Sequence, residues 1–360
     1  MPKVAIVGAG SSVFARRLVT DMLTWPSLQD STIALMDIDE NRLETMATLA
    51  HRMVTQTGVG AMVESSTNLH SALDGADYVT VAIRVGEGRS NVDIPLKYGI
   101  SQAIGDTTGP GGTFYFLRNA PAIINIAKTM EEICPDALML NYTNPMVMLS
   151  WAVRKLSNVR YVGLCHSVQG TARQLAEYIR MPFEEISYWV AGINHMAWFL
   201  KFQCRGKDAY SKLGEAMNDP DIYERDIVRW EIFKYFGAFV TESSIHNSEY
   251  MPYFRRTPEL IDRYTSEKMW GILSKSISKQ ERMAFYLKAG AGEEAENKRL
   301  AYNDEEIPVE RSHEYFSHIL NAIETNVPYV FNGNVPNTNL ITNLLQDCIV
   351  EVPIVADGCG

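Results

Sequence analysis

The hydrophobic and polar positions of the first 165 residues form short apolar runs separated by longer amphipathic stretches. The apolar, β-branched runs predict buried parallel strands at residues 4–7, 32–36, 78–83, 138–140 and 161–164. The amphipathic stretches predict helices at residues 15–23, 41–54 and 119–133. Because strands that alternate with helices build a parallel sheet covered on both faces, we predict an α/β fold with a doubly wound sheet of the Rossmann type.

The pattern changes after about residue 160. Helical and irregular segments then dominate, and aromatic and methionine side chains are concentrated between Tyr188 and Tyr264. We therefore predict two domains, a Rossmann domain over residues 1–160 and a second, mostly helical α+β lobe over residues 161–360. The charge-rich segment 279–303 is expected to be an exposed helix or a mobile loop.

Composition narrows the class of protein. A chain of 360 residues is too long for one ordinary hydrophobic core, and its 46% hydrophobic and 21% charged residues are typical of a soluble globular protein. The net charge of −10 argues against a nucleic-acid-binding surface. We find no signal peptide and no apolar stretch of the roughly 18 residues that a membrane span needs, so the cytoplasm is the expected location. Five scattered cysteines form no disulfide framework, but one chemically used thiol is compatible with them.

A glycine turn follows the first predicted strand. Gly8 permits the tight turn, Gly10 lets a phosphate approach the backbone, and Ser11 and Ser12 lead into the helix whose N–H groups would face a pyrophosphate. Asp37 ends the next strand, where a carboxylate can bind ribose hydroxyls and repel a 2′-phosphate, which favours NAD over NADP. The usual third glycine is absent, so a tight turn without a nucleotide is the alternative.

Cys165 and His195 are candidate metal ligands. A thiolate and an imidazole can hold a borderline divalent ion and leave positions open for substrate oxygens, but the 30-residue spacing is not a metal signature by itself. Both side chains could instead be packed structural residues. The adjacent His166 could donate a proton, and Asn144 follows a strand at the edge where ligands bind in this fold. Their alternatives are a hydrogen-bonded histidine and a turn residue.

Further candidates come from loops. Arg84 and Arg89 flank a glycine-containing turn after a strand, and we assign Arg84 to the cofactor and Arg89 to the substrate, with surface arginines as the alternative. Asp106 opens the polar glycine loop at 106–112, and we assign it to the substrate. Tyr250 is one of 17 tyrosines, and it could act as a base if a cation lowered its pKa.

Taken together, these segments resemble glycoside hydrolase family 4, the NAD- and metal-dependent glycosidases. The resemblance covers nearly the whole chain, in the family's order, through GAGSSVF, MDID, AIRVGEGRSNVDIPLKYGI, DTTGPGG, NYTNP, GLCHSVQG, AGINHMAW, SEYMPYF and LITNLLQDCIVEVP. The combination CHSVQG with AGINHMA is most similar to the α-galactosidase branch. The family's further C-terminal segment is expected to be missing after Gly360.

The resemblance implies roles for individual residues. Cys165 and His195 match the metal ligands, usually of Mn²⁺ and otherwise of Co²⁺ or Ni²⁺. Tyr250 matches the base that removes the proton from sugar C2, and Asn144 and Arg89 match substrate contacts. The position of His166 holds a candidate general acid in some relatives.

The implied reaction is hydrolysis of an unphosphorylated α-galactoside. It proceeds by NAD-dependent oxidation at C3, metal-assisted deprotonation at C2, elimination, addition of water and re-reduction, so that no net oxidation results. A homodimer or homotetramer is expected. The alternatives are an α-glucosidase or α-uronidase of the same family, an NAD-dependent hydroxy-acid dehydrogenase, and a non-enzymatic NAD-binding remnant.

Overall fold

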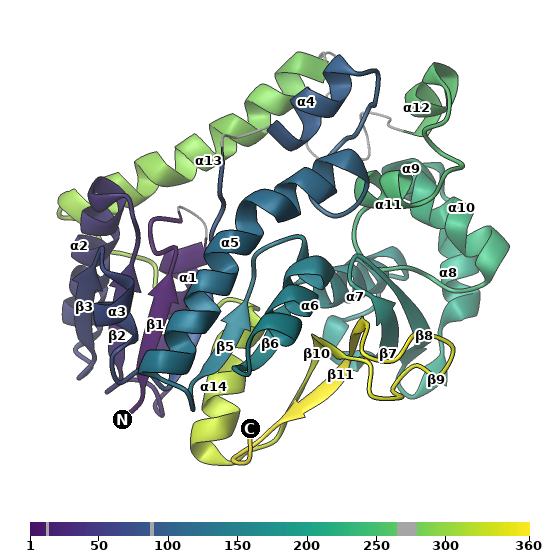
Figure 1. Cartoon of the computed structure of the whole chain (residues 1–360). Coiled ribbons are helices and arrows are strands. Elements are labelled where there is room, and N and C mark those ends of the chain that lie inside the picture. Colours follow the sequence, from purple (N-terminus) through teal and green to yellow (C-terminus); the bar gives the residue numbers. More distant parts are fainter. Residues whose placement is uncertain (12–13, 87–89, 265–278) are drawn as a thin grey trace.

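The strands form one continuous sheet. The structure, a computed structural model, describes residues 1–11, 14–86, 90–264 and 279–360. Over these residues eleven strands pair in the order β3-β2-β1-β4-β5-β6-β10-β11-β7-β8-β9 (Figure 1). Their bounds are β1 Lys3–Val7, β2 Thr32–Met36, β3 Met62–Ser66, β4 Tyr78–Val81, β5 Leu138–Asn141, β6 Arg160–Leu164, β7 Ile186–Ile193, β8 Met196–Cys204, β9 Lys207–Asp208, β10 Tyr329–Pro336 and β11 Ile349–Ala356.

The six strands from β3 to β6 are parallel, and their order is that of a Rossmann domain. The predicted α/β fold class is thereby confirmed. Helices fill the connections and the second lobe. Their bounds are α1 Phe14–Leu23, α2 Glu40–Thr57, α3 Leu69–Leu73, α4 Ser90–Lys97, α5 Gly109–Ile133, α6 Met146–Leu156, α7 Ser167–Tyr178, η1 Phe183–Glu185, α8 Tyr210–Ala216, α9 Pro220–Arg225, α10 Ile227–Phe236, α11 Ser244–Tyr250, α12 Pro258–Tyr264, α13 Lys279–Tyr302 and α14 Tyr315–Thr325.

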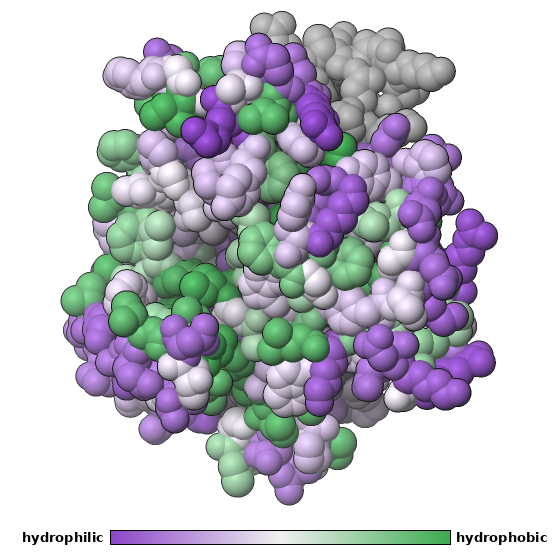
Figure 2. Space-filling view, turned by 90° about the vertical axis from the view of Figure 1, so that its right-hand side faces the viewer, coloured by the Kyte–Doolittle hydropathy of each residue, from purple (hydrophilic) through white to green (hydrophobic). Residues whose placement is uncertain are grey.

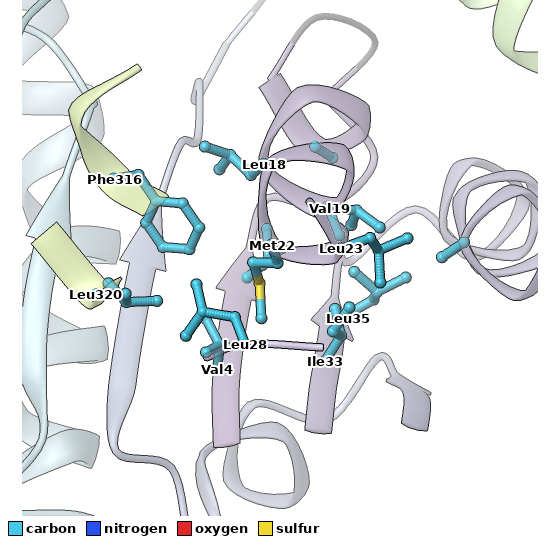
Figure 3. Packing of buried hydrophobic residues seen from close by; sticks show 14 of the residues in the cluster. Val4, Leu18, Val19, Met22, Leu23, Leu28, Ile33, Leu35, Phe316 and Leu320 are labelled. Atoms are coloured by element: carbon cyan, nitrogen blue, oxygen red, sulfur yellow. The ribbon is translucent and has the colours of Figure 1, made fainter. Parts of the chain in front are cut away.

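Strand β1 shows why the sheet is covered on both faces. Val4 and Ile6 pack into one hydrophobic cluster with α1, α2 and α14, whereas Ala5 and Val7 pack into another with α3, α5 and α6. Successive side chains of a strand point to opposite faces, so an uninterrupted apolar run is buried on both. In the first cluster Phe316 of α14 faces α1 (Figure 3).

The charge-rich segment, for which an exposed helix or a mobile loop was expected, forms helix α13. It runs along α2 (Figure 1), and Glu294 and Glu296 form ion pairs of 3.2 Å and 3.0 Å with Arg42 and Arg16. A small cavity between the glycine turn and α13 is lined by Gly10 and by Glu294. A helix remote in sequence therefore borders the expected cofactor region.

The second lobe extends the sheet with antiparallel strands that the apolar pattern did not predict. Strand β10 pairs with β6, so that Gly333 lies opposite Leu164 and Asn334 opposite Gly163. Strands β11, β7, β8 and β9 then continue the sheet. Strand β6, which belongs to the parallel set, begins at residue 160. The domain boundary placed at that residue stays a prediction. None of the helices described combines the length and apolarity of a membrane span.

Candidate active site

The glycine turn lies at the carboxyl end of β1, and its geometry fits a dinucleotide phosphate. Gly8 has φ +93°, and a Cβ there would lie 2.4 Å from the carbonyl oxygen of Ala82. A Cβ on Gly10 would lie 2.8 Å from Oδ2 of Asp37. Only glycine keeps this backbone and leaves the surface bare for a close approach.

Asp37 directly follows β2 and Arg84 follows β4, the two strands that flank β1. The Asp37 carboxylate accepts hydrogen bonds from the backbone N–H groups of Gly10 at 2.8 Å and Asp39 at 2.9 Å. The guanidinium of Arg84 lies 5.4 Å from the centroid of the Tyr115 ring. Ser11 accepts a hydrogen bond from the N–H group of Phe14 at the start of α1. The predicted contacts Ser12 and Arg89 lie outside the described residues.

Cys165 and His195 are brought together with a residue that the sequence analysis did not select, Glu242. Their potential ligand atoms all lie within 4.8 Å of one another. Cys165 directly follows β6, His195 lies in the turn between β7 and β8, and Glu242 precedes α11. Burial raises the pKa of the Cys165 thiol far above its usual value, and the carboxylates of Glu351 and Glu242 raise it further. A thiolate here therefore requires a neighbouring cation.

The two ring nitrogens of His195 face different partners. Nδ1 lies 2.9 Å from Oγ1 of Thr107 and 3.3 Å from the hydroxyl of Tyr250. Nε2 lies 3.7 Å from Oε2 of Glu242. The side chain is almost fully buried, and the backbone φ is +65°. A histidine that binds a metal through one nitrogen is usually oriented through the other, which is the arrangement found here.

Tyr250 is the last residue of α11, and its ring is stacked with that of His195 at a centroid distance of 6.5 Å. Burial raises the pKa of the Tyr250 hydroxyl well above its usual value, and the negative charges of Asp106, Glu242 and Glu249 also raise it. The phenol is therefore neutral unless a cation is bound nearby.

Asp106 joins the same group from the loop before α5. Its Oδ2 lies 3.5 Å from Nδ2 of Asn144, and its Oδ1 lies 3.7 Å from Nε2 of His246. Burial would raise the pKa of Asp106, but His246 and His195 outweigh it, so the pKa lies below its usual range. We call Asp106, Cys165, His195, Glu242, His246 and Tyr250 the polar cluster.

Behind the polar cluster lies a fully buried carboxyl group, Glu351 of β11. Nδ2 of Asn194 donates to its Oε1 at 3.4 Å. Burial raises the pKa of Glu351 to about 7. The oxygens Oε2 of Glu351, Oδ1 of Asn194 and Oδ1 of Asn144 are buried without a hydrogen-bond partner among the described residues. This excess of acceptors fits a bound cation or a retained proton.

His166 lies at the rim of the site. Its side chain is 60% exposed, and Nδ1 lies 3.7 Å from Oε1 of Glu314. Its ring centroid is 6.3 Å from that of Phe14. The position leaves room for a role at the leaving group, and that role stays a prediction.

Sequence reasoning missed Glu242 and His246. A signal was present for His246, because it precedes Tyr250 by four residues. That spacing places side chains on one face of a helix. Applied to α11, it would have joined His246 to the selected tyrosine. Glu242 precedes the helix with φ +73°, so no helical spacing pointed to it.

A cavity of about 790 Å³ adjoins the site. Its wall includes Thr107, Asn194, Trp198, Tyr250 and Leu344. The β7–β8 hairpin also carries exposed apolar side chains. Figure 2 shows the side of the molecule with β8 and β9, where hydrophobic side chains gather on the lower part.

The donor set fits a borderline divalent metal, since a thiolate, an imidazole and a carboxylate converge beside a neutral tyrosine. The bare glycine turn with Asp37 at its edge likewise fits a dinucleotide. The metal fit rests on residues from distant parts of the chain, whereas the dinucleotide fit rests on residues 8–37.

Comparisons with known proteins agree with this assignment of chemistry. Residues 3–181 match the model "Family 4 glycosyl hydrolase", and residues 190–360 match "Family 4 glycosyl hydrolase C-terminal domain". The chain is 40% identical to an α-galactosidase of Bacillus subtilis (strain 168), over 99% of this chain and 82% of that protein. It is 36% identical to an α-galactosidase of Rhizobium meliloti (strain 1021), over 99% and 74%.

Among solved structures, the chain is similar to the 6-phospho-β-glucosidase of Thermotoga maritima determined with manganese, NAD⁺ and glucose-6-phosphate. The TM-score is 0.78 at 25% identity, covering 99% of this chain and 81% of that chain.

Proposed function

The chain belongs to family 4 of the glycosyl hydrolases, and on that premise we propose that it hydrolyses α-galactosides with bound NAD and a divalent metal. Mn²⁺ is the first choice of metal, with Co²⁺ and Ni²⁺ as alternatives. The likeness to two α-galactosidases supports the substrate, and the manganese and NAD⁺ of the Thermotoga maritima enzyme support the cofactors. The observation that carries the chemistry is the Tyr250 hydroxyl, 3.3 Å from Nδ1 of His195.

Two separate groups of residues would bind the dinucleotide and the metal. When bound, NAD supplies a reversible hydride acceptor and the divalent metal supplies a Lewis acid. Gly8, Gly10 and Asp37 would hold the dinucleotide, and Cys165 and His195 would hold the metal. The contacts described above support both assignments.

Tyr250 would accept the proton from sugar C2. Its hydroxyl is neutral in the surroundings described, because burial and neighbouring carboxylates raise its pKa. A cation beside His195 opposes those carboxylates and favours the phenolate. Asp106 of the polar cluster and Asn144, which lies beside it, would bind sugar hydroxyls, and His166 would assist the leaving group from the rim.

One assay tests the proposal against its alternatives. The reduced protein is incubated with p-nitrophenyl α-galactoside, NAD⁺ and Mn²⁺, and both nitrophenol and NADH are followed. We expect nitrophenol without accumulation of NADH, and faster turnover than with the α-glucoside or α-galacturonide. Steady formation of NADH would indicate a dehydrogenase, and bound NAD without any turnover would indicate a remnant.

We also propose that the enzyme acts in the cytoplasm as a homodimer or homotetramer. Light scattering of the purified protein tests the oligomer, and a monomer at assay concentration would contradict it. Fractionation of cells that express the chain tests the location.

A further inference from the structure

Glu242 has an unusual backbone conformation beside the candidate metal ligands Cys165 and His195. Its φ is +73°, in the left-handed region that residues with a Cβ seldom adopt. His195 shares this property, with φ +65°. Such conformations persist where the surrounding structure imposes them, and they are concentrated at functional sites. Here both residues direct a side chain towards the same point.

The distances at that point are those of two ligands around one ion. Oε2 of Glu242 lies 3.7 Å from Nε2 of His195, which is too long for a hydrogen bond. Two ligand atoms that are each about 2.1 Å from an ion lie roughly 3.4 Å apart at a tetrahedral angle. Cys165 completes the group, since the ligand atoms of all three residues lie within 4.8 Å of one another.

We propose that Glu242 is a third protein ligand of the divalent metal, through Oε2, beside Sγ of Cys165 and Nε2 of His195. This inference rests on the proposed function, because it takes the metal from there. A thiolate and a carboxylate together neutralise a divalent cation. Three protein ligands also leave coordination positions for substrate oxygens.

His246 would orient this ligand. Its Nδ1 lies 3.1 Å from the other carboxylate oxygen of Glu242, Oε1, and 2.9 Å from Oγ of Ser243. Its Nε2 faces Asp106 at 3.7 Å. An outer-shell contact of this kind fixes the rotation of a ligating carboxylate, so that one oxygen points to the ion. His246 is therefore a positioning residue.

A second group of possible ligands, Asp106, His195 and His246, lies next to the first. It offers no thiol, and Nδ1 of His195, on the side of Thr107, is already 2.9 Å from that hydroxyl. The Asp106 carboxylate also accepts a hydrogen bond from Thr107 at 2.8 Å. The group with Cys165 and Glu242 is therefore the better site.

Titration with Co²⁺ tests the inference on the full chain, reduced and without NAD or substrate. We expect wild-type protein to give a thiolate-to-cobalt charge-transfer band that disappears in Cys165→Ser. Glu242→Gln should keep that band, change the ligand-field bands, and raise the dissociation constant about 100-fold. Glu242→Asp should recover part of the affinity, and His246→Gln should lose less, about 10-fold.

Glu231→Gln provides the matched control. Glu231 lies in α10 and pairs with Lys234 at 2.7 Å, away from the cluster, so its variant should bind Co²⁺ like the wild type. Circular dichroism and NAD binding establish that the Glu242 variants are folded. If Glu242→Gln failed to fold, the affinity and ligand-field bands of Glu242→Asp would decide, since a ligand shortened by one methylene must change both.

Wild-type affinity and ligand-field bands in folded Glu242→Gln would overturn the inference, as would a loss of binding in Asp106→Asn but not in Glu242→Gln. In either case, continued α-galactoside hydrolysis by the wild type would leave the proposed function standing. A wild type that hydrolyses no glycoside but binds Co²⁺ as described would keep the ligand set and contradict the function. A wild type that binds no Co²⁺ would overturn the inference and the metal requirement together.

Discussion

The glycine turn and the polar cluster lie at the same edge of one sheet, yet they are built in different ways. The turn uses backbone atoms of residues 8–10 and a single side chain, Asp37, which follows the adjacent strand. The polar cluster uses side chains from residues 106 to 250, in four separate loops and helices. A site made of backbone tolerates most side-chain changes, whereas a site made of converging side chains depends on each of them.

The largest effect should come from breaking the polar cluster at its thiol. Cys165→Ser, or removal of metal by a chelator, should reduce α-galactosidase activity below detection, because the thiolate and its cation stabilise each other. Adding Mn²⁺ back should restore the chelated wild type but not the variant. NAD binding, measured by fluorescence, should be unchanged in both, and a parallel loss there would contradict the separation of the two sites.

Tyr250→Phe should reduce kcat by roughly 10²–10⁴-fold, the usual contribution of a positioned acid or base. The hydroxyl is the only group removed, so the affinity for Co²⁺ should change little. Exchange of the C2 proton with solvent, followed by NMR, should be lost. Retained exchange in a slow variant would exclude Tyr250 as the base.

Glu351 allows a test of stability rather than activity. Burial raises its pKa from its usual 4.5 to about 7. The native metal-free protein therefore keeps a proton that the unfolded chain loses, and the free energy of unfolding falls as the pH rises from about 4.5 to about 7. Glu351→Gln stays neutral, and it should remove up to about 3 kcal/mol of that decline.

Urea unfolding at pH 5 and pH 8 measures this difference. The exposed Glu132 of α5 provides the control, since Glu132→Gln should follow the wild-type pH dependence. A Glu351→Gln curve parallel to that of the wild type would show that the carboxyl group is ionised in the native state.

The smallest effect should come from the glycine turn. Asp37→Asn removes one charge but leaves the backbone N–H groups, so the dissociation constant of NAD should rise only about tenfold. Affinity for NADP should improve, because the repulsion of a 2′-phosphate is lost. Calorimetry with both nucleotides provides the measurement, and a loss of all NAD binding would mean that this site, too, depends on one side chain.

Local patterns in the sequence determined the parallel half of the fold and the glycine turn. Residues 4–7 and 32–36 are apolar on both faces, and the turn residues Gly8 and Gly10 lie directly after the first strand. Strand β3 was missed because it is an edge strand with mostly exposed residues. The motifs of the family resemblance selected Cys165, His195 and Tyr250, and the structure places these three together.

Only the tertiary structure decided the antiparallel half of the sheet and which side chains surround Cys165, His195 and Tyr250. Strand β10 pairs with β6 across about 170 residues of sequence, and no local period encodes such a partner. The same pairing carries β11, and with it Glu351, behind Cys165. Glu242 and His246 become neighbours of His195 only because α11 and the residues just before it lie against the β7–β8 turn. A short-range pattern reports which face of an element is buried, but the fold decides which charges share that burial.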